Sequence, residues 1–139
     1  MRTFFRFTLR VLRTEAMKLG INTDPVLERA GYHIGSVLAP MVRDRDLEEK
    51  IRMLDQFWQQ HGLGNMKLVA QDPITLQVTG CFECMELPVT GHGACAFDTG
   101  VLTALFAEEM QGFAQVTEVE CYSSGFDHCM FIITKRSPD

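Results

Sequence analysis

The first half of the chain has apolar positions at helical spacing, in three segments separated by turn signals. Residues 2–19 carry one apolar stripe at steps of four and three residues, formed by Phe5, Leu9, Leu12, Ala16 and Leu19. Asp24 followed by Pro25 is typical of a helix start and predicts a second helix over residues 25–41. A third predicted helix covers residues 45–61 and places on one side Leu47, Ile51, Leu54 and Trp58.

Beyond residue 64 the pattern changes to short segments bounded by glycine and proline. Strands are predicted over residues 66–70, 74–80, 81–87, 115–121 and 128–135. A fourth helix is predicted over residues 94–111, after a loop at residues 88–93. This order of elements predicts an α+β fold, with an antiparallel sheet packed against helices.

Two glycines lie four residues apart in the second predicted helix, at Gly31 and Gly35. Each destabilises a helix interior by about 1 kcal/mol relative to alanine. The pair would let another backbone approach this helix closely.

Composition excludes several classes of protein. The 139 residues are 46% hydrophobic and 22% charged, which suits one globular domain with its own core. No apolar run is long enough to span a bilayer as a helix. No secretory signal is evident, so we expect a cytoplasmic protein. A net charge of −5 argues against binding to nucleic acid.

The charge is unevenly distributed along the chain. Residues 1–18 hold four arginines and one lysine against one acid, whereas the remainder holds eight bases against 17 acids. A mitochondrial presequence has a similar composition. We instead divide the chain into an N-terminal amphipathic helix over residues 1–20 and a main domain over residues 21–139.

The apolar stripe of the N-terminal helix must be buried, either against a partner subunit or against a membrane surface. The acidic remainder attracts a basic helix and is repelled by anionic lipid. We therefore favour a partner subunit over peripheral membrane contact, and we expect a homodimer.

Five cysteines lie in the last 60 residues, which suggests thiol or metal chemistry in place of a disulfide framework. Cys95 opens the fourth predicted helix, Cys121 ends a predicted strand and Cys129 begins the return strand. Their thiolates can converge on one zinc ion. The residues alone leave the fourth ligand open among Glu118, Glu120, Asp127, His128 and the pair Cys81 and Cys84.

Four motifs in the chain resemble the 4-vinyl reductase domain family. They are Gly93-Ala-Cys95-Ala-Phe97-Asp-Thr-Gly100, Glu118-Val-Glu-Cys121, Gly125-Phe-Asp-His-Cys129-Met-Phe131 and Gly31-Tyr-His-Ile-Gly35. The family includes proteins found beside bacteriochlorophyll biosynthesis and the aromatic-sensing domain of phenol- and xylene-responsive transcription activators. The resemblance covers residues 25–135. It implies a dimer with a fold related to the small subunits of the Golgi transport-protein-particle complex.

The resemblance also implies a zinc site formed by Cys95, Glu118, Cys121 and Cys129. On a straight strand Glu118 and Cys121 point to opposite faces, so this set needs a β-bulge or the end of the strand. With four protein ligands the site keeps no open position for water, which makes the zinc structural.

Cys81 and Cys84 form a CxxC motif that the family pattern does not require. No βαβ pattern precedes the motif, which disfavours a thioredoxin-like role. We interpret both as part-buried cysteines, in preference to a redox pair or a second metal site.

The expected ligand is a hydrophobic or aromatic small molecule, with a tetrapyrrole such as a chlorophyll precursor as one option. We expect its cavity between the helices at 25–41 and 45–61 and the sheet. A drug-sized guest needs above roughly 300 Å³. The candidate ligand-binding residues are His33, Trp58, Phe82 and Phe97.

No catalytic constellation is evident, because the sequence lacks a nucleophile elbow, a phosphate loop and a dinucleotide fingerprint. We therefore expect a binding protein that acts as a carrier, a sensor or an assembly factor. Two alternatives stay open: an accessory component in the 4-vinyl reduction of (bacterio)chlorophyll precursors, and a pure protein-interaction module.

Overall fold

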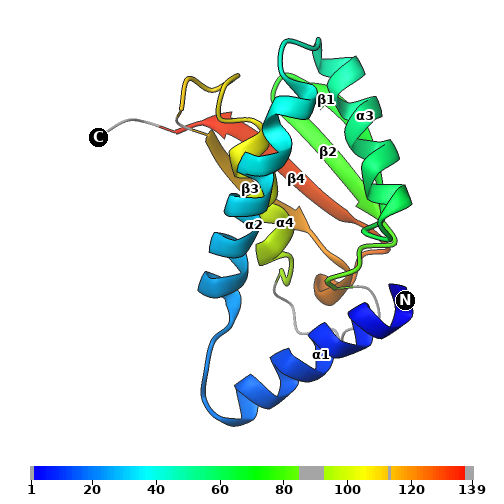
Figure 1. The fold of residues 1–139 in the computed structure, drawn as a ribbon, viewed down its shortest axis with the longest axis vertical. Helices are drawn as coiled ribbons and strands as arrows, with labels where there is room; N and C mark the ends of the chain where they lie inside the picture. Colours follow the sequence, from blue (N-terminus) through cyan, green and yellow to red (C-terminus); the bar gives the residue numbers. More distant parts are fainter. Residues whose placement is uncertain (1, 85–92, 113, 137–139) are drawn as a thin grey trace.

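The computed structural model describes residues 2–84, 93–112 and 114–136, which form four α-helices and one four-stranded sheet (Figure 1). The helices are α1 (Arg2–Lys18), α2 (Asp24–Leu38), α3 (Leu47–Gln60) and α4 (Ala96–Leu105). The strands are β1 (Asn65–Gln71), β2 (Ile74–Thr79), β3 (Ala114–Glu120) and β4 (Cys129–Lys135). Two short 3-10 segments are η1 (Ala39–Val42) and η2 (Tyr122–Ser124). The predicted α+β class is confirmed.

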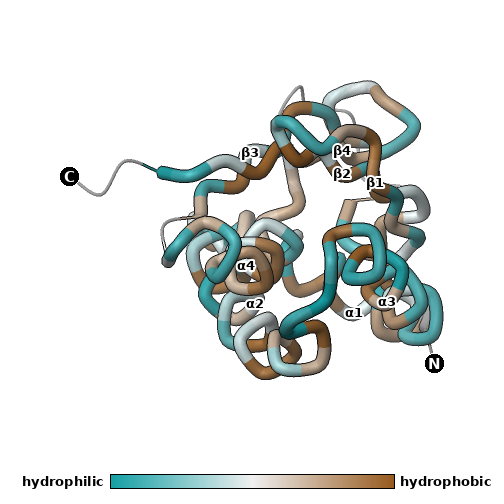
Figure 2. The backbone as a smooth tube through the Cα atoms, turned by 90° about the horizontal axis from the view of Figure 1, so that it is seen from above, coloured by the Kyte–Doolittle hydropathy of each residue, from teal (hydrophilic) through white to brown (hydrophobic). Residues whose placement is uncertain are grey.

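Neighbouring strands of the sheet run antiparallel, in the order β1-β2-β4-β3. The two central strands bury alternate residues, including Leu76 and Val78 of β2 and Phe131 and Ile133 of β4. Figure 2 shows the helices gathered on one side of the strands. The buried residues of β2 and β4 form one core with residues of α3 and α4.

One predicted strand is wrong over its described part. Residues 82–84 form a turn, and residues 85–87 lie outside the described residues, as do residues 88–92 of the predicted loop. The chain therefore leaves β2 and reverses direction within a few residues, which brings Cys81 and Cys84 back toward the core.

The predicted close approach at Gly31 and Gly35 is present, and the approaching backbone is that of α4. A Cβ at Gly31 would lie 2.2 Å from the carbonyl oxygen of Phe97, and one at Gly35 would lie 2.5 Å from that of Val101. From the other side, a Cβ at Gly100 would lie 2.1 Å from a carbonyl oxygen of α2. Only glycine permits this contact between the two backbones.

Helix α4 is shorter than predicted, because it ends at Leu105 and residues 106–112 form turns. The buried ammonium group of Lys50 donates hydrogen bonds to the carbonyl oxygen of Leu105 and to the carboxylate of Glu109. The same group lies 4.2 Å from the centre of the Phe106 ring. Lys50 thus satisfies a carbonyl at the end of α4 that a further helical turn would otherwise have bonded.

Helix α1 crosses one end of the molecule and lies away from the sheet (Figure 1). Its predicted apolar stripe is largely exposed on this chain, with Phe5 at 56% and Leu12 at 61% of their full accessibility. Arg13 donates a hydrogen bond to the carbonyl oxygen of Ala94, in the segment before α4. In the described part of the chain, no helix has both the length and the apolarity required to cross a membrane.

Candidate functional site

All five cysteines are buried, and each has a free thiol. Cys95 is the N-cap of α4, Cys121 directly follows β3 and Cys129 begins β4, as the sequence predicts. Cys81 and Cys84 lie in the segment that follows β2. The fold therefore brings cysteines from separate elements into one cluster.

The zinc set implied by the sequence resemblance is assembled in the structure. One ligand atom from each of Cys95, Glu118, Cys121 and Cys129 lies within 4.8 Å of all the others. The Sγ atom of Cys121 is 3.9 Å from that of Cys95 and 3.9 Å from that of Cys129. Because Zn–S bonds of about 2.3 Å at tetrahedral angles put sulfur atoms about 3.8 Å apart, these separations suit zinc.

The β-bulge that this set requires is present in β3. Glu118 pairs with Phe131 of β4, and after the register shift Glu120 pairs with Met130. The extra residue brings Cys121 level with Cys129. Glu118 and Cys121 therefore reach the same face of the sheet.

The carboxylate of Glu118 sits against the chain just before α4. Its Oε1 atom accepts a hydrogen bond from the backbone N–H of Cys95 at 3.4 Å. A Cβ at Gly93 would lie 2.1 Å from the same oxygen, so a side chain at that position would displace the carboxylate. The Oε2 atom is buried and has no hydrogen-bond partner among the described residues. A buried anionic oxygen without a donor fits a site that receives a cation.

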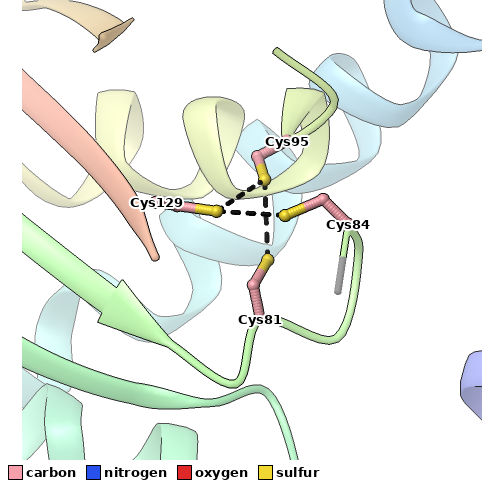
Figure 3. A group of neighbouring side chains, drawn as sticks. All are labelled: Cys81, Cys84, Cys95 and Cys129. Atoms are coloured by element: carbon pink, nitrogen blue, oxygen red, sulfur yellow. Dashed lines mark hydrogen bonds between the residues drawn. The ribbon is translucent and has the colours of Figure 1, made fainter. Parts of the chain in front are cut away.

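Cys81 and Cys84 are fully buried, which corrects the expectation that they are part-buried. The Sγ atom of Cys81 is 3.5 Å from that of Cys95, and the Sγ atom of Cys84 is 3.0 Å from that of Cys129. Figure 3 shows these four thiols pointing toward a common centre. The four form a second group that could hold a metal ion, and this group shares Cys95 and Cys129 with the first.

The electrostatics of the cluster favour a cation. Hydrogen bonds from neighbouring thiols hold the pKa of Cys121 and of Cys81 well below the ordinary thiol range. The same neighbours raise the pKa of Cys95 and of Cys129. Burial raises the pKa of Glu118 to about 7. Without a metal ion, some of the thiols and carboxyl groups of the cluster stay protonated. A divalent ion would stabilise the deprotonated, anionic form of all its ligands.

The other candidate ligands lie outside both groups. Among the described residues, neither group includes Glu120, Asp127 or His128. His128 interacts with both of the others, since its ring lies 2.7 Å from Asp127 Oδ1 and 3.3 Å from Glu120 Oε2. The structure thus separates Glu118 from Glu120, which the residue spacing alone could not do.

An apolar pocket of about 200 Å³ lies between the helices and is lined largely by aromatic rings. Its lining residues are Phe5, Ile34, Leu38, Phe57, Trp58, His61, Leu63, Phe82, Phe97 and Val101. The rings of Phe82 and Phe97 meet edge to face with centres 5.4 Å apart, and Phe5 of α1 stacks on Phe82 at 6.0 Å. None of these described lining residues belongs to a strand, so the expected wall from the sheet is replaced by α1, α4 and the segment after β2.

Three of the four predicted ligand-binding residues line this pocket, namely Trp58, Phe82 and Phe97. The fourth, His33, does not. Gly31 and Gly35 turn one face of α2 toward α4, and His33, two residues from each, lies exposed on the opposite face. Sequence reasoning missed His61 as a lining residue, although it follows Phe57 by one helical turn and packs against that ring at 4.2 Å.

The indole Nε1–H of Trp58 is buried and has no hydrogen-bond partner within the described part of the chain. A buried donor without an acceptor is unfavourable by about 1–3 kcal/mol. Trp58 is also one of the residues that line the apolar pocket.

Residues 74–135 match the family model of the 4-vinyl reductase domain. An uncharacterised protein of Methanocaldococcus jannaschii is 25% identical to the chain over 122 residues, which cover 88% of this chain and 72% of the relative. The range that matches the family model contains all five cysteines and Glu118.

Solved structures share the fold of this chain. A vinyl-4-reductase family protein from Methanocaldococcus jannaschii has a TM-score of 0.60 at 20% identity, over 99% of this chain and 82% of that one. The phenol-responsive sensory domain of the transcription activator PoxR, solved with phenol, has a TM-score of 0.68 at 18% identity, over 94% and 74%. Trafficking protein particle complex subunit 3 from Naegleria fowleri, covalently bound to palmitic acid, has a TM-score of 0.68 at 13% identity, over 98% and 95%. The resemblance predicted from the motifs is confirmed.

Proposed function

We propose that this protein binds a small molecule with a single aromatic ring and acts as a sensing domain, with a structural zinc ion in its cysteine cluster. The aromatic pocket carries the proposal, together with the buried indole N–H of its lining residue Trp58, which has no hydrogen-bond partner among the described residues. The PoxR sensory domain, which has the same fold and was solved with phenol, supports this class of ligand.

The volume of the pocket favours a guest of one ring. An engineered apolar cavity of about 150 Å³ accepts benzene, whereas pockets for drug-sized ligands run from about 300 to 1,000 Å³. A pocket of about 200 Å³ suits one ring with a small substituent. A tetrapyrrole, which the family resemblance also allows, needs far more space.

Zinc at Cys95, Glu118, Cys121 and Cys129 would act on the pocket through α4. Cys95 begins this helix, and Phe97, two residues later, lines the pocket. A metal that fixes Cys95 therefore also fixes one aromatic wall. Elemental analysis tests this part: protein purified without chelators that contains no metal, and whose five thiols all titrate freely in the native state, would exclude it.

Binding of phenol and toluene tests the ligand class. Trp58 is the single tryptophan of the chain, so its fluorescence reports directly on the pocket. We expect saturable 1:1 binding of both compounds. In Trp58→Phe, calorimetry should show a loss of phenol affinity of about 2- to 12-fold, which corresponds to a hydrogen bond of about 0.5–1.5 kcal/mol. Toluene has no acceptor, so its affinity should change less.

His33→Ala is the matched control, because His33 lies on the exposed face of α2 and should leave phenol binding unchanged. If neither compound binds saturably, or if Trp58→Phe weakens phenol and toluene equally, the proposed ligand contact is wrong.

A further inference from the structure

The cysteine cluster holds more donors than one zinc ion can use. Its two groups together contain five thiols and one carboxylate, and both groups contain Cys95 and Cys129. We infer that the centre binds two zinc-type divalent ions bridged by the thiolates of Cys95 and Cys129. Glu118 and Cys121 complete the first ion, and Cys81 and Cys84 complete the second. The inference rests on the zinc ion of the proposed function and adds a second metal site to it.

The distances between sulfur atoms fit a bridged pair. The two bridging Sγ atoms, of Cys95 and Cys129, are 3.4 Å apart. With Zn–S bonds of about 2.3 Å, a four-membered ring built on this edge places the two metal ions about 3 Å apart. At the second ion, the Sγ atom of Cys81 is 3.5 Å from that of Cys95, and the Sγ atom of Cys84 is 3.0 Å from that of Cys129. Cys81 and Cys84 come from the same turn of the chain (Figure 3).

Charge also favours the second ion. One divalent ion with four anionic ligands leaves the centre with two negative charges, and it leaves Cys81 and Cys84 buried without a cation. Two divalent ions with all six donors ionised give the same net charge. The second ion therefore lets both remaining thiols bind as thiolates without adding buried charge, which is unfavourable when it is uncompensated.

A buried carboxylate beside Cys81 supplies an independent observation. Asp98 is only 1% exposed, and its Oδ1 atom has no hydrogen-bond partner in the described part of the chain. Its Oδ2 atom lies 3.6 Å from the Sγ atom of Cys81. The first ion has the same feature in the unpartnered Oε2 atom of Glu118. Each of the two metal groups thus has a carboxylate beside it or within it that keeps one oxygen without a partner, and a cation in the group would stabilise that carboxylate.

The segment that carries Cys81 and Cys84 is held in place by contacts other than metal. Glu83, between the two cysteines, accepts hydrogen bonds from the backbone N–H groups of Phe97 at 2.8 Å and Asp98 at 3.2 Å. These bonds satisfy donors at the N-terminus of α4. The two thiols are therefore already positioned beside Cys95 before an ion binds.

Phe82, the other residue between the two cysteines, lines the aromatic pocket. An ion held by Cys81 and Cys84 would thus fix a second wall of the pocket, as the first ion does through Phe97.

Metal content per chain tests the inference on the 139-residue protein loaded with zinc. We expect two zinc ions in the wild type and one in Cys81→Ser/Cys84→Ser. The control Thr79→Ser, at the end of β2 and outside both groups, should keep two. X-ray absorption of the wild type should show a zinc–zinc distance of about 3 Å. This measurement, together with two signals in ¹¹³Cd NMR of the cadmium form, decides the question even if the double variant does not fold.

A wild type with one zinc ion that the double variant retains would overturn the second site and leave the proposed function intact. A wild type with one ion that the double variant loses would also overturn it, because the four cysteines would then form a single mononuclear site. A wild type with no metal would remove the zinc of the proposed function as well.

Discussion

Arg13 of α1 lies 3.6 Å from Glu83, and this contact ties the N-terminal helix to the segment that contains Cys81 and Cys84. The Glu83 side chain is fully buried, and that of Arg13 is 15% exposed. Burial raises the pKa of Glu83 well above its usual range, and the nearby Cys81 raises it further, while the α4 N–H groups and Arg13 oppose this shift. One contact thus links a peripheral helix to both the cysteine cluster and the aromatic pocket.

Replacing Arg13 should loosen this link. Arg13→Gln removes the guanidinium beside the buried Glu83 and weakens the bond to the Ala94 carbonyl. We expect the free energy of unfolding to fall by about 1–3 kcal/mol, the range for a buried polar group that loses its partner. Urea denaturation measures this, and hydrogen exchange should show faster opening of α1. Lys18→Ala is the control, because Lys18 pairs with Glu15 on the surface and should change stability by under about 1 kcal/mol.

Glu118 and Glu120 form a matched pair for testing the zinc set. Glu118→Gln removes an anionic donor from the cluster. Mutating a residue that merely hydrogen-bonds to a metal ligand lowers metal affinity by about 10- to 100-fold, so we expect zinc affinity to fall by at least this much. Glu120→Gln should leave the affinity within a few-fold, because Glu120 contacts His128 and lies outside both metal groups. Competition with a chromophoric chelator measures both. Equal losses would show that Glu118 is not a ligand.

The backbone contact between α2 and α4 should tolerate no side chain. In Gly31→Ala the new Cβ would lie 2.2 Å from the Phe97 carbonyl oxygen, so the helices must separate. We expect a destabilisation of about 1–3 kcal/mol, typical of overpacking, although alanine favours the helix itself. Thermal unfolding measures the change. Ser36→Ala, on the exposed face of α2, is the control, and an equal effect there would contradict the packing argument.

The exposed apolar side of α1 should mediate dimerisation. Deletion of residues 1–19 should give a monomer in sedimentation at micromolar concentration, because five apolar side chains lose their partner. Leu12→Glu, at a position that is 61% exposed, should have the same effect with the pocket residue Phe5 kept. Thr14→Glu, also exposed on α1, is the control. A truncated protein that stays dimeric, while the intact chain floats with anionic liposomes, would support membrane binding instead.

Much of the fold follows from local sequence patterns. Helical spacing predicts α1, α2 and α3 to within a few residues, and the glycine pair predicts the close helix contact. The end of α4 is not predictable in this way, because the residue that binds the Leu105 carbonyl is Lys50, 55 positions earlier in the chain. A local apolar pattern carries no information about such a partner.

The candidate metal site was only partly predictable for a similar reason. Cysteine spacing and the family resemblance indicate Cys95, Cys121 and Cys129, but the bulge that selects Glu118 leaves no mark in the sequence of β3. The predicted strand over residues 81–87 would turn the thiols of Cys81 and Cys84 apart, so the sequence does not predict that both join the cluster. The turn at residues 82–84 directs both into the cluster.

The contact between α2 and α4 also determines how the pocket can respond to a guest. Where two backbones touch at Gly31, Gly35 and Gly100, there are no side chains whose rotamers could change, so the two helices behave as one stiff unit. The pocket walls on these helices keep a fixed spacing. Any expansion on binding must therefore be taken up by α1 or α3. Helix α1 reaches the pocket through Phe5 and exposes most of its other apolar side chains. A guest in the pocket would therefore change the molecular surface by shifting this helix.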